Sequence, residues 1–220
     1  MSKLIICLFG PQGSGKGTQA KILTQNLHVP HISTGDLFRL AIESRTELGR
    51  QVEQIITSGQ LVSDEITFNL LKERISNLDC AEGFILDGYP RTIKQAELLD
   101  QNVKISQVIF IEISDEEAVK RLTNRRQCPQ CSAIFNLYTL PKPKADELCD
   151  HCQVKLAQRV DDTENAVRER LRHYHAETEP LIKYYKNKVA RINGEQTIEK
   201  VAEDISQSIG RLQLNQMLDN

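Results

Sequence analysis

Four cysteines in the second half of the chain occur in two closely spaced pairs. Cys128 and Cys131 form the first pair and Cys149 and Cys152 the second, which gives the pattern C-x₂-C-x₁₇-C-x₂-C. Two such pairs supply the four thiolates of a tetrahedral Zn²⁺ site. Four protein ligands leave no position for substrate or water, so the spacing predicts a structural metal site. Iron could occupy the same four thiolates, and the spacing alone does not decide between the two metals.

A glycine-rich segment, GPQGSGKGTQ at residues 10–19, directly follows an apolar run and begins a helical pattern. It fits G-x-x-x-x-G-K, in which the glycines let backbone N–H groups surround phosphate oxygens and Lys16 reaches the outer phosphates. Gly17 stands where Ser or Thr usually follows the lysine, so Thr18 is the nearest hydroxyl for a magnesium ion. The segment predicts a site for a nucleoside triphosphate or a similar polyphosphate. The predicted phosphate-binding residues are Gly13, Ser14, Gly15, Lys16, Gly17 and Thr18.

The composition is that of an ordinary globular protein. The chain has 220 residues, 40% hydrophobic and 26% charged, with a formal net charge of −2. This length fits one large domain, or one domain with insertions. The near-neutral charge gives no bulk field for DNA or RNA and argues against a nucleic-acid partner. No apolar run approaches the roughly 20 residues that span a bilayer, and the N-terminal run is too short for a signal peptide, so we expect a cytoplasmic protein.

Short apolar runs alternate with helical patterns along most of the chain. Unbroken apolar runs are typical of strands buried on both faces of a parallel sheet, and their alternation with helices predicts an α/β fold. The expected strands are 4–9, 83–86, 108–113 and 188–192, and the expected helices are 16–27, 37–57, 64–77, 92–100, 115–126, 163–187 and 197–212.

Residues 127–158 interrupt this alternation with the four paired cysteines and little helical periodicity. An insertion of about 30 residues cannot bury enough apolar surface to be stable alone, so a metal ion would supply the missing stability. We therefore expect an inserted subdomain held together by metal. Cys7 and Cys80 lie outside it, have no partner motif and are expected to be buried residues.

Four further segments follow in a distinctive order: STGDLFR (33–39), GQLVSDE (59–65), LDGYPRT (86–92) and RVDDTENAVRERL (159–171). Together with the glycine-rich segment they resemble the nucleoside monophosphate kinases, and most closely the adenylate kinases. The resemblance covers nearly the whole chain. It implies a P-loop NTPase-type three-layer fold with a central five-stranded parallel sheet, a helical NMP-binding insertion and a zinc-binding lid. The implied parts are a core at 1–32, 63–124 and 160–220, an NMP-binding segment at 33–62 and a lid at 125–159.

The resemblance implies reversible phosphoryl transfer from Mg-ATP to AMP, giving two ADP, by direct in-line displacement. Such catalysis rests on positioning and on positive charge around the transferred group. The implied cofactors are Mg²⁺ and a structural Zn²⁺. The implied partners are ATP, AMP and ADP for a monomer without nucleic-acid or membrane partners. Two alternatives remain: a kinase for UMP, CMP or GMP, and a nucleotide-switched zinc ribbon that binds nucleic acid, which the sparse aromatic residues disfavour.

The resemblance also assigns roles to charged side chains at the ends of elements. Arginine suits phosphate because its planar fork binds two oxygens at once and keeps its charge. Asp87 would hold magnesium through water, since Mg²⁺ keeps much of its hydration shell. Asp161 and Asp162 leave two possibilities open, a place near the closing phosphates or capping of the helix that follows. The implied catalytic residues are Lys16, Asp87, Arg91, Arg125, Arg159 and Arg170.

The same comparison of motifs implies contacts to both nucleotides. On the ATP side, Arg121 would lie against the base and Phe135 would cover it, although a lone Phe in a small subdomain is as often core. The implied ATP-binding residues beyond the glycine-rich segment are Arg121, Ile134, Phe135 and Gln196. The implied AMP-binding residues are Thr34, Arg39, Gln60, Leu61, Val62, Gly88, Tyr89, Pro90, Arg91, Gln95, Arg159 and Arg170.

Overall fold

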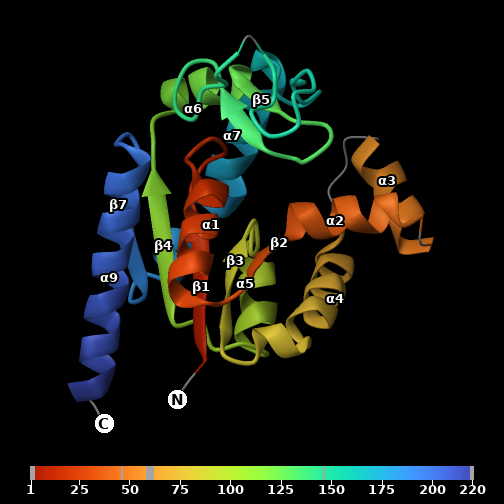
Figure 1. The fold of residues 1–220 in the computed structure, drawn as a ribbon. Coiled ribbons are helices and arrows are strands. Elements are labelled where there is room, and N and C mark those ends of the chain that lie inside the picture. The colour runs from red at the N-terminus through yellow and green to blue at the C-terminus, as the bar shows by residue number, and fades with distance from the viewer. Residues whose placement is uncertain (1–2, 46, 58–61, 146, 219–220) are drawn as a thin grey trace.

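A five-stranded parallel sheet runs through the centre of the protein (Figure 1). The structure is a computed structural model, and it describes residues 3–45, 47–57, 62–145 and 147–218. The strand order is β2-β3-β1-β4-β7, and every neighbouring pair is parallel. This arrangement confirms the predicted α/β fold with its central sheet. The strands are β1 (Leu4–Phe9), β2 (His31–Ser33), β3 (Gly83–Asp87), β4 (Gln107–Glu112) and β7 (Val189–Asn193).

Side chains on the two faces of the sheet pack into two separate hydrophobic clusters. On β1, Cys7 lies in one cluster, whereas Ile6 and Leu8 lie in the other, as the two-residue period of a strand requires. The first cluster is covered by α4, α5 and α8, and the second by α1 and α9. The covering helices are α1 (Lys16–Leu27), α4 (Asp64–Ile75), α5 (Ile93–Asp100), α8 (Leu181–Tyr184) and α9 (Ile198–Leu218), and η1 (Leu78–Cys80) is a short 3₁₀ turn.

Both clusters consist of residues that are almost fully removed from water. Complete burial of one Leu or Ile side chain stabilises a fold by roughly 1.5–3 kcal/mol, so these clusters are the main stabilising feature of the core. Cys7 and Cys80 are each 0% exposed, which confirms that they are buried. Among the described residues, no helix combines the length and apolarity needed to cross a membrane.

Two helices, α2 (Thr34–Glu43) and α3 (Glu47–Thr57), project to one side of the sheet (Figure 1). The single helix predicted at 37–57 is therefore wrong. Arg45 adopts a left-handed φ of 51°, which a continuing right-handed helix cannot contain. The two helices then pack closely, because a Cβ added to Gly49 would lie only 2.0 Å from the Ala41 carbonyl oxygen.

A small subdomain lies beyond the carboxyl ends of β1 and β4 (Figure 1). Helix α6 (Asp115–Thr123) leads into it, and α7 (Glu164–His173) leads back. It contains an antiparallel pair, β5 (Arg125–Gln127) and β6 (Ile134–Asn136), and its own core of Cys128, Phe135, Cys149 and Leu156. A separate cluster that includes Leu122 and Leu171 joins α6 to α7 at its base.

The single helix predicted at 163–187 is also wrong. After α7 the chain forms a π turn, η2 (Tyr174–Thr178), in which the Glu179 amide donates to the Tyr174 carbonyl oxygen at 2.9 Å. Pro180 follows and has no N–H to continue the helical hydrogen bonds, so the regular pattern ends there. Helix α8 then starts at Leu181.

His175 connects this π turn to the start of α6. Its Nδ1 lies 2.8 Å from Glu179 Oε2, and its Nε2 lies 2.9 Å from Asp115 Oδ1. The hydrogen bond to Glu179 and the interaction with Asp115 raise the pKa of His175, although partial burial opposes them. Protonation of His175 is therefore more favourable in the folded than in the unfolded protein.

We expect this contact to stabilise the protein fully below pH about 6.5, the usual pKa of histidine, and to be lost as pH rises through the higher folded pKa. The difference in unfolding free energy between the wild type and His175→Gln should therefore shrink as pH rises from 6 toward 9. Urea unfolding at several pH values measures it. A difference that stays constant over this range would contradict the assignment.

Candidate active site

The glycine-rich segment forms a tight loop between β1 and α1, in the strand–loop–helix order that the motif requires. Gly10, Gly13 and Gly15 have φ values of 143°, 87° and 94°, which favour glycine. A Cβ on Gly10 would also lie 2.4 Å from the Ile111 carbonyl oxygen. The loop therefore depends on glycine both for its conformation and for its close approach to the sheet.

Lys16 begins α1 and folds back over the loop. Its Nζ donates to the carbonyl oxygens of Gly10, at 2.8 Å, and Pro11, at 2.9 Å. Burial, together with the positive charges of Arg91, Arg170 and Arg125, lowers the pKa of Lys16 to about 8, against the opposing effect of Asp87. The site thus carries more positive charge than its own carboxylate balances, which favours an anionic ligand.

Asp87 ends β3 and faces the start of α1. Burial acts to raise its pKa, but His31 Nε2 at 3.5 Å and the charges of Lys16 and Arg91 outweigh burial and hold the pKa below its usual value. Asp87 Oδ2 would lie 3.9 Å from a Cβ placed on Gly17. One partly buried, ionised carboxylate beside a phosphate loop fits Mg²⁺, which binds few protein ligands and retains water.

Arginines from separate segments converge near this loop. Arg91 is exposed by surface area, yet the protein around it displaces enough water to lower its pKa; the charge of Arg170 adds to this effect and Asp87 opposes it. Burial also lowers the pKa of Arg159, together with the charges of Arg125 and Arg39. Cations from α2, β5 and α7 therefore lower the pKa of Arg91 or Arg159.

Asp162 is 0% exposed and binds two of these arginines. Arg125 donates to its two oxygens through Nε and Nη2, both at 2.7 Å, and Arg170 Nη1 lies 3.5 Å from Oδ1. Arg170 Nη1 also donates to Asp161 Oδ2 at 2.6 Å. The helix cap is Thr163, whose Oγ1 accepts from the Ala166 amide, so the alternative in which the two aspartates cap α7 is wrong.

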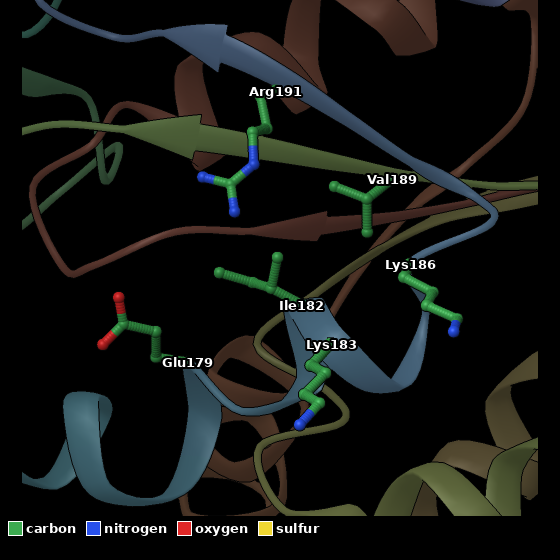
Figure 2. Close-up of a pocket in the computed structure, with 6 residues that line it drawn as sticks. All are labelled: Glu179, Ile182, Lys183, Lys186, Val189 and Arg191. Atoms are coloured by element: carbon green, nitrogen blue, oxygen red, sulfur yellow. The ribbon is translucent and has the colours of Figure 1, made fainter.

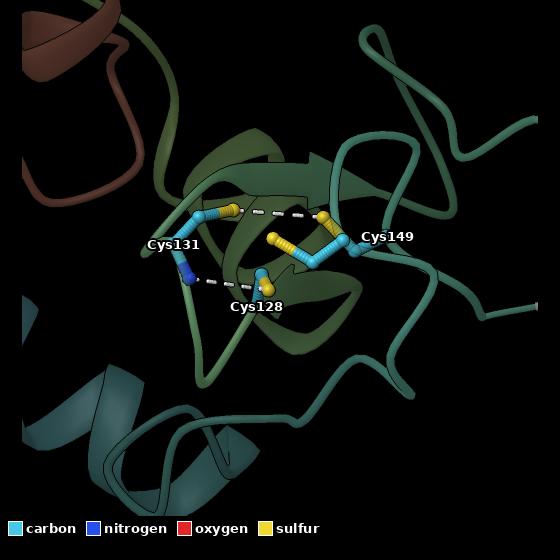
Figure 3. Close-up of side chains that lie close together, drawn as sticks. Cys128, Cys131 and Cys149 are labelled. Carbon is cyan, nitrogen blue, oxygen red and sulfur yellow. Dashed lines mark hydrogen bonds between the residues drawn. The ribbon is translucent and has the colours of Figure 1, made fainter.

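The four paired cysteines come together in the small subdomain (Figure 3). Their sulfur atoms all lie within 4.8 Å of one another, and Cys131 Sγ is 3.6 Å from Cys149 Sγ. A tetrahedral zinc ion with Zn–S bonds of about 2.3 Å places its sulfurs about 3.8 Å apart. The Cys131 amide also donates to Cys128 Sγ at 3.4 Å, as suits a thiolate. The cluster therefore fits a structural zinc ion.

Comparison with known proteins agrees with this geometry. The sequence profile of the family described as adenylate kinase matches residues 8–190. An adenylate kinase from Petrotoga mobilis is 50% identical over 207 residues, which cover 91% of this chain and 94% of that protein. Adenylate kinases from Thermosipho africanus and Thermotoga maritima are 47% and 46% identical, over 92% and 93% of this chain and 97% and 96% of theirs.

The chain belongs to the adenylate kinase family. The resemblance inferred from five motifs is thereby confirmed at the level of the family and its fold. The roles of individual residues in this member remain predictions.

The residues predicted for ATP lie around the loop, the small subdomain and the end of the sheet. Arg121 is on α6, and its Nη2 donates to the Gly194 carbonyl oxygen at 3.0 Å. Ile134 is 40% exposed, whereas Phe135 is 4% exposed and packs in the core of the subdomain. Phe135 thus offers little surface to a base. Gln196 Nε2 donates to the Asn193 carbonyl oxygen at 2.9 Å, close to the end of β7.

The residues predicted for AMP lie mainly where β2 and β3 end. Thr34 Oγ1 donates to the Gly88 carbonyl oxygen at 2.9 Å, and Arg91 Nε donates to the same oxygen at 2.9 Å. Tyr89 is 1% exposed and belongs to the core. Arg39, on α2, pairs with Asp36. Pro90 directly follows Tyr89, Val62 precedes the cap of α4, and Gln60 and Leu61 lie outside the described residues.

Gln95 connects several of these elements. Its Oε1 accepts from the Arg91 amide at 2.7 Å, and its Nε2 donates to Asp64 Oδ1 at 2.7 Å. The predicted base-reading amide is therefore engaged with the protein. Sequence reasoning missed Asp64 and His31 as neighbours of the site, because both contacts join residues far apart in the chain. Asp64 lies within the segment GQLVSDE, but nothing in that segment indicates its contact with Gln95, and no motif contains His31.

A separate cleft of about 470 Å³ lies between α8 and β7 (Figure 2). The predicted site residues do not line it. Arg191 and Val189 extend from β7 toward Ile182 on α8, and two lysines lie at the edge (Figure 2). Arg191 is already paired with Glu112 at 2.5 Å and stacks over Phe110. This cleft therefore has no part in the site described above.

For the metal site we expect chelation under reducing conditions to release one zinc ion per chain and to loosen the small subdomain before the sheet. The melting temperature should fall by roughly 5 °C or more, since 1 kcal/mol corresponds to about 2–4 °C for a chain of this size. Hydrogen exchange should show protection lost first at residues 125–159.

Cys128→Ser should lose zinc, whereas the control Cys80→Ser, which alters a buried thiol outside the cluster, should keep it. Elemental analysis of the two purified variants makes the comparison. A zinc-free wild type with an unchanged melting temperature would overturn the structural role of the metal.

Proposed function

We propose that this member of the adenylate kinase family catalyses reversible phosphoryl transfer from Mg-ATP to AMP, giving two ADP. The observation that carries this proposal is the convergence of Lys16 and several arginines from separate segments near the phosphate loop, an arrangement that suits two bound polyanions. Two polyanions must be held side by side for direct transfer, and catalysis of that step depends on positioning and charge.

In the proposed reaction an oxygen of the AMP phosphate attacks the γ-phosphorus of ATP, and the bond from that phosphorus to the β-phosphate oxygen breaks. Asp87 would hold a magnesium ion, which would supply positive charge to the phosphates of ATP. Lys16 would exchange its bonds to the Gly10 and Pro11 carbonyls for phosphate oxygens.

The arginines would have two tasks, to bind the phosphate of the acceptor AMP and to bind the phosphoryl group that is transferred. Arg39 and Arg91 are proposed to hold the AMP phosphate, and Arg125, Arg159 and Arg170 to surround the group in transit. Asp162 supports this by holding Arg125 and Arg170 in place through its buried carboxylate. Arginines fixed before substrate arrives lose less side-chain entropy when they bind it.

We also propose the division into a core, an NMP-binding segment at 33–62 and a zinc-binding lid at 125–159 that closes over ATP. Closure would exclude water, which could otherwise hydrolyse the triphosphate. We propose further that the protein is a cytoplasmic monomer without nucleic-acid or membrane partners, which its near-neutral net charge of −2 supports.

The decisive test is a panel of acceptors in a coupled ADP assay with the zinc-loaded protein. We expect AMP to exceed UMP, CMP and GMP by at least about tenfold in kcat/KM. A preference for another monophosphate would establish the alternative kinase. No transfer to any of them, with salt-dependent retention on single-stranded nucleic acid, would favour the zinc-ribbon binder instead.

Lys16→Met should reduce kcat by roughly 10²–10³-fold or more, because it removes a fixed charge from the transferring phosphates. Lys21→Met, the same change at an exposed position on the same helix, should leave activity near wild type. Circular dichroism of both variants checks the fold. Substantial turnover by folded Lys16→Met would contradict the role given to the phosphate loop.

A further inference from the structure

Glu117 lies between the guanidinium of Arg121 and a tyrosine of the small subdomain. Its Oε1 accepts from Arg121 Nε at 2.7 Å, one turn further along α6. Its Oε2 accepts from the Tyr138 hydroxyl at 3.3 Å. The side chains of Glu117 and Arg121 are only 18% and 16% exposed, so the ion pair is partly shielded from water. One carboxylate thus binds two groups from different parts of the fold.

Arg121 is held from two further directions. Its Nη2 donates to the Gly194 carbonyl oxygen at 3.0 Å, after β7, and its Nη1 lies 3.5 Å from the Gly13 carbonyl oxygen in the phosphate loop. Of the three groups that these contacts bring to the guanidinium, Glu117 is the charged one, and it is the one that accepts from Nε. The plane of the guanidinium is therefore defined by α6, the phosphate loop and the segment after β7.

A fixed guanidinium plane matters for contact with a nucleotide base. Arginine stacks on aromatic rings through its flat face, and a free side chain carries about 2 kcal/mol of rotamer entropy that such stacking must overcome. A glutamate four residues before the arginine on a helix has the favourable orientation for an ion pair. Glu117 therefore lowers the cost of presenting Arg121 to a base.

The small subdomain contacts the same turn of α6 at a second point. Asn136 Nδ2 donates to the Arg121 carbonyl oxygen at 2.7 Å, and Asn136 Oδ1 accepts from the Tyr138 amide at 2.9 Å. Tyr138 is thus positioned by Asn136 and reaches back to Glu117 with its hydroxyl. The backbone of Arg121 is thus connected to the end of β6, and its side chain is connected through Glu117 to the segment that follows.

We propose that Glu117 is a positioning residue that holds Arg121 flat against the base of the donor nucleotide, and that Tyr138 links this arrangement to the zinc-binding subdomain. The inference rests on the proposed function, because it concerns the donor site of that reaction. It assigns to this chain a base platform built from α6 and the subdomain together. Glu117 acts through Arg121 and does not itself touch the nucleotide.

Glu117→Gln should raise the KM for ATP by about tenfold, the equivalent of one charge-assisted hydrogen bond, while the KM for AMP and kcat change by less than about threefold. The matched control is Glu116→Gln, the same change at an exposed position of the same helical turn. Calorimetry should show weaker binding of ATP but unchanged binding of inorganic tripolyphosphate, which has no base.

A double-mutant cycle tests whether Glu117 acts through Arg121. In an Arg121→Met background, Glu117→Gln should have no further effect on ATP binding. Tyr138→Phe should weaken ATP binding by about twofold to threefold in the wild type and less in Glu117→Gln. Equal effects of Glu117→Gln on ATP and tripolyphosphate, or additive effects with Arg121→Met, would overturn the inference.

Failure of the positioning role can be distinguished from failure of the proposed function. A wild type that forms no ADP from ATP and any monophosphate would refute that function. A wild type that is active while Glu117→Gln resembles Glu116→Gln in every measurement would refute only the positioning role.

Discussion

Mutual repulsion among the positive charges at the phosphate loop is the constraint on which the rest of the structure depends. Three arginines lie close enough to Lys16 that their charges help to lower its pKa: Arg91, Arg125 and Arg170. In a folded chain such a cluster of positive charges must be stabilised by neutral dipoles or by a few buried carboxylates. Carbonyl oxygens of the loop hold Lys16, and Asp162 holds two of the arginines.

Two projecting parts of the molecule carry some of these cations, which reduces the number of positive charges that lie in the core. Arg39 extends from α2, and Arg125 and Arg159 border the zinc-binding subdomain. A subdomain of this size lacks a large apolar core, so a metal cluster keeps it rigid while its base rests on α6 and α7. Glu117 and Tyr138 connect that base to Arg121, which lies beside the phosphate loop.

Local patterns accounted for the phosphate loop, the metal cluster and most of the strands. The glycine-rich loop and each cysteine pair are short segments whose geometry follows from neighbouring residues. β2 was missed because three residues, HIS, carry no apolar run. The helices predicted at 37–57 and 163–187 were each divided, at Arg45 by a left-handed residue and near Pro180 by a π turn, because helical periodicity does not report such interruptions.

The sequence by itself determined which groups could bind phosphate and metal, because the spacing within a motif is a property of adjacent residues. The tertiary structure alone decided which charges meet. The strand order β2-β3-β1-β4-β7 brings Asp87 to Lys16, and the return of the chain at α7 brings Asp162 to Arg125, 37 residues away. Glu117 could be paired with Arg121 from helical spacing, but its contact with Tyr138 depends on how the subdomain folds back. Such contacts depend on which distant partners the packed elements bring within reach.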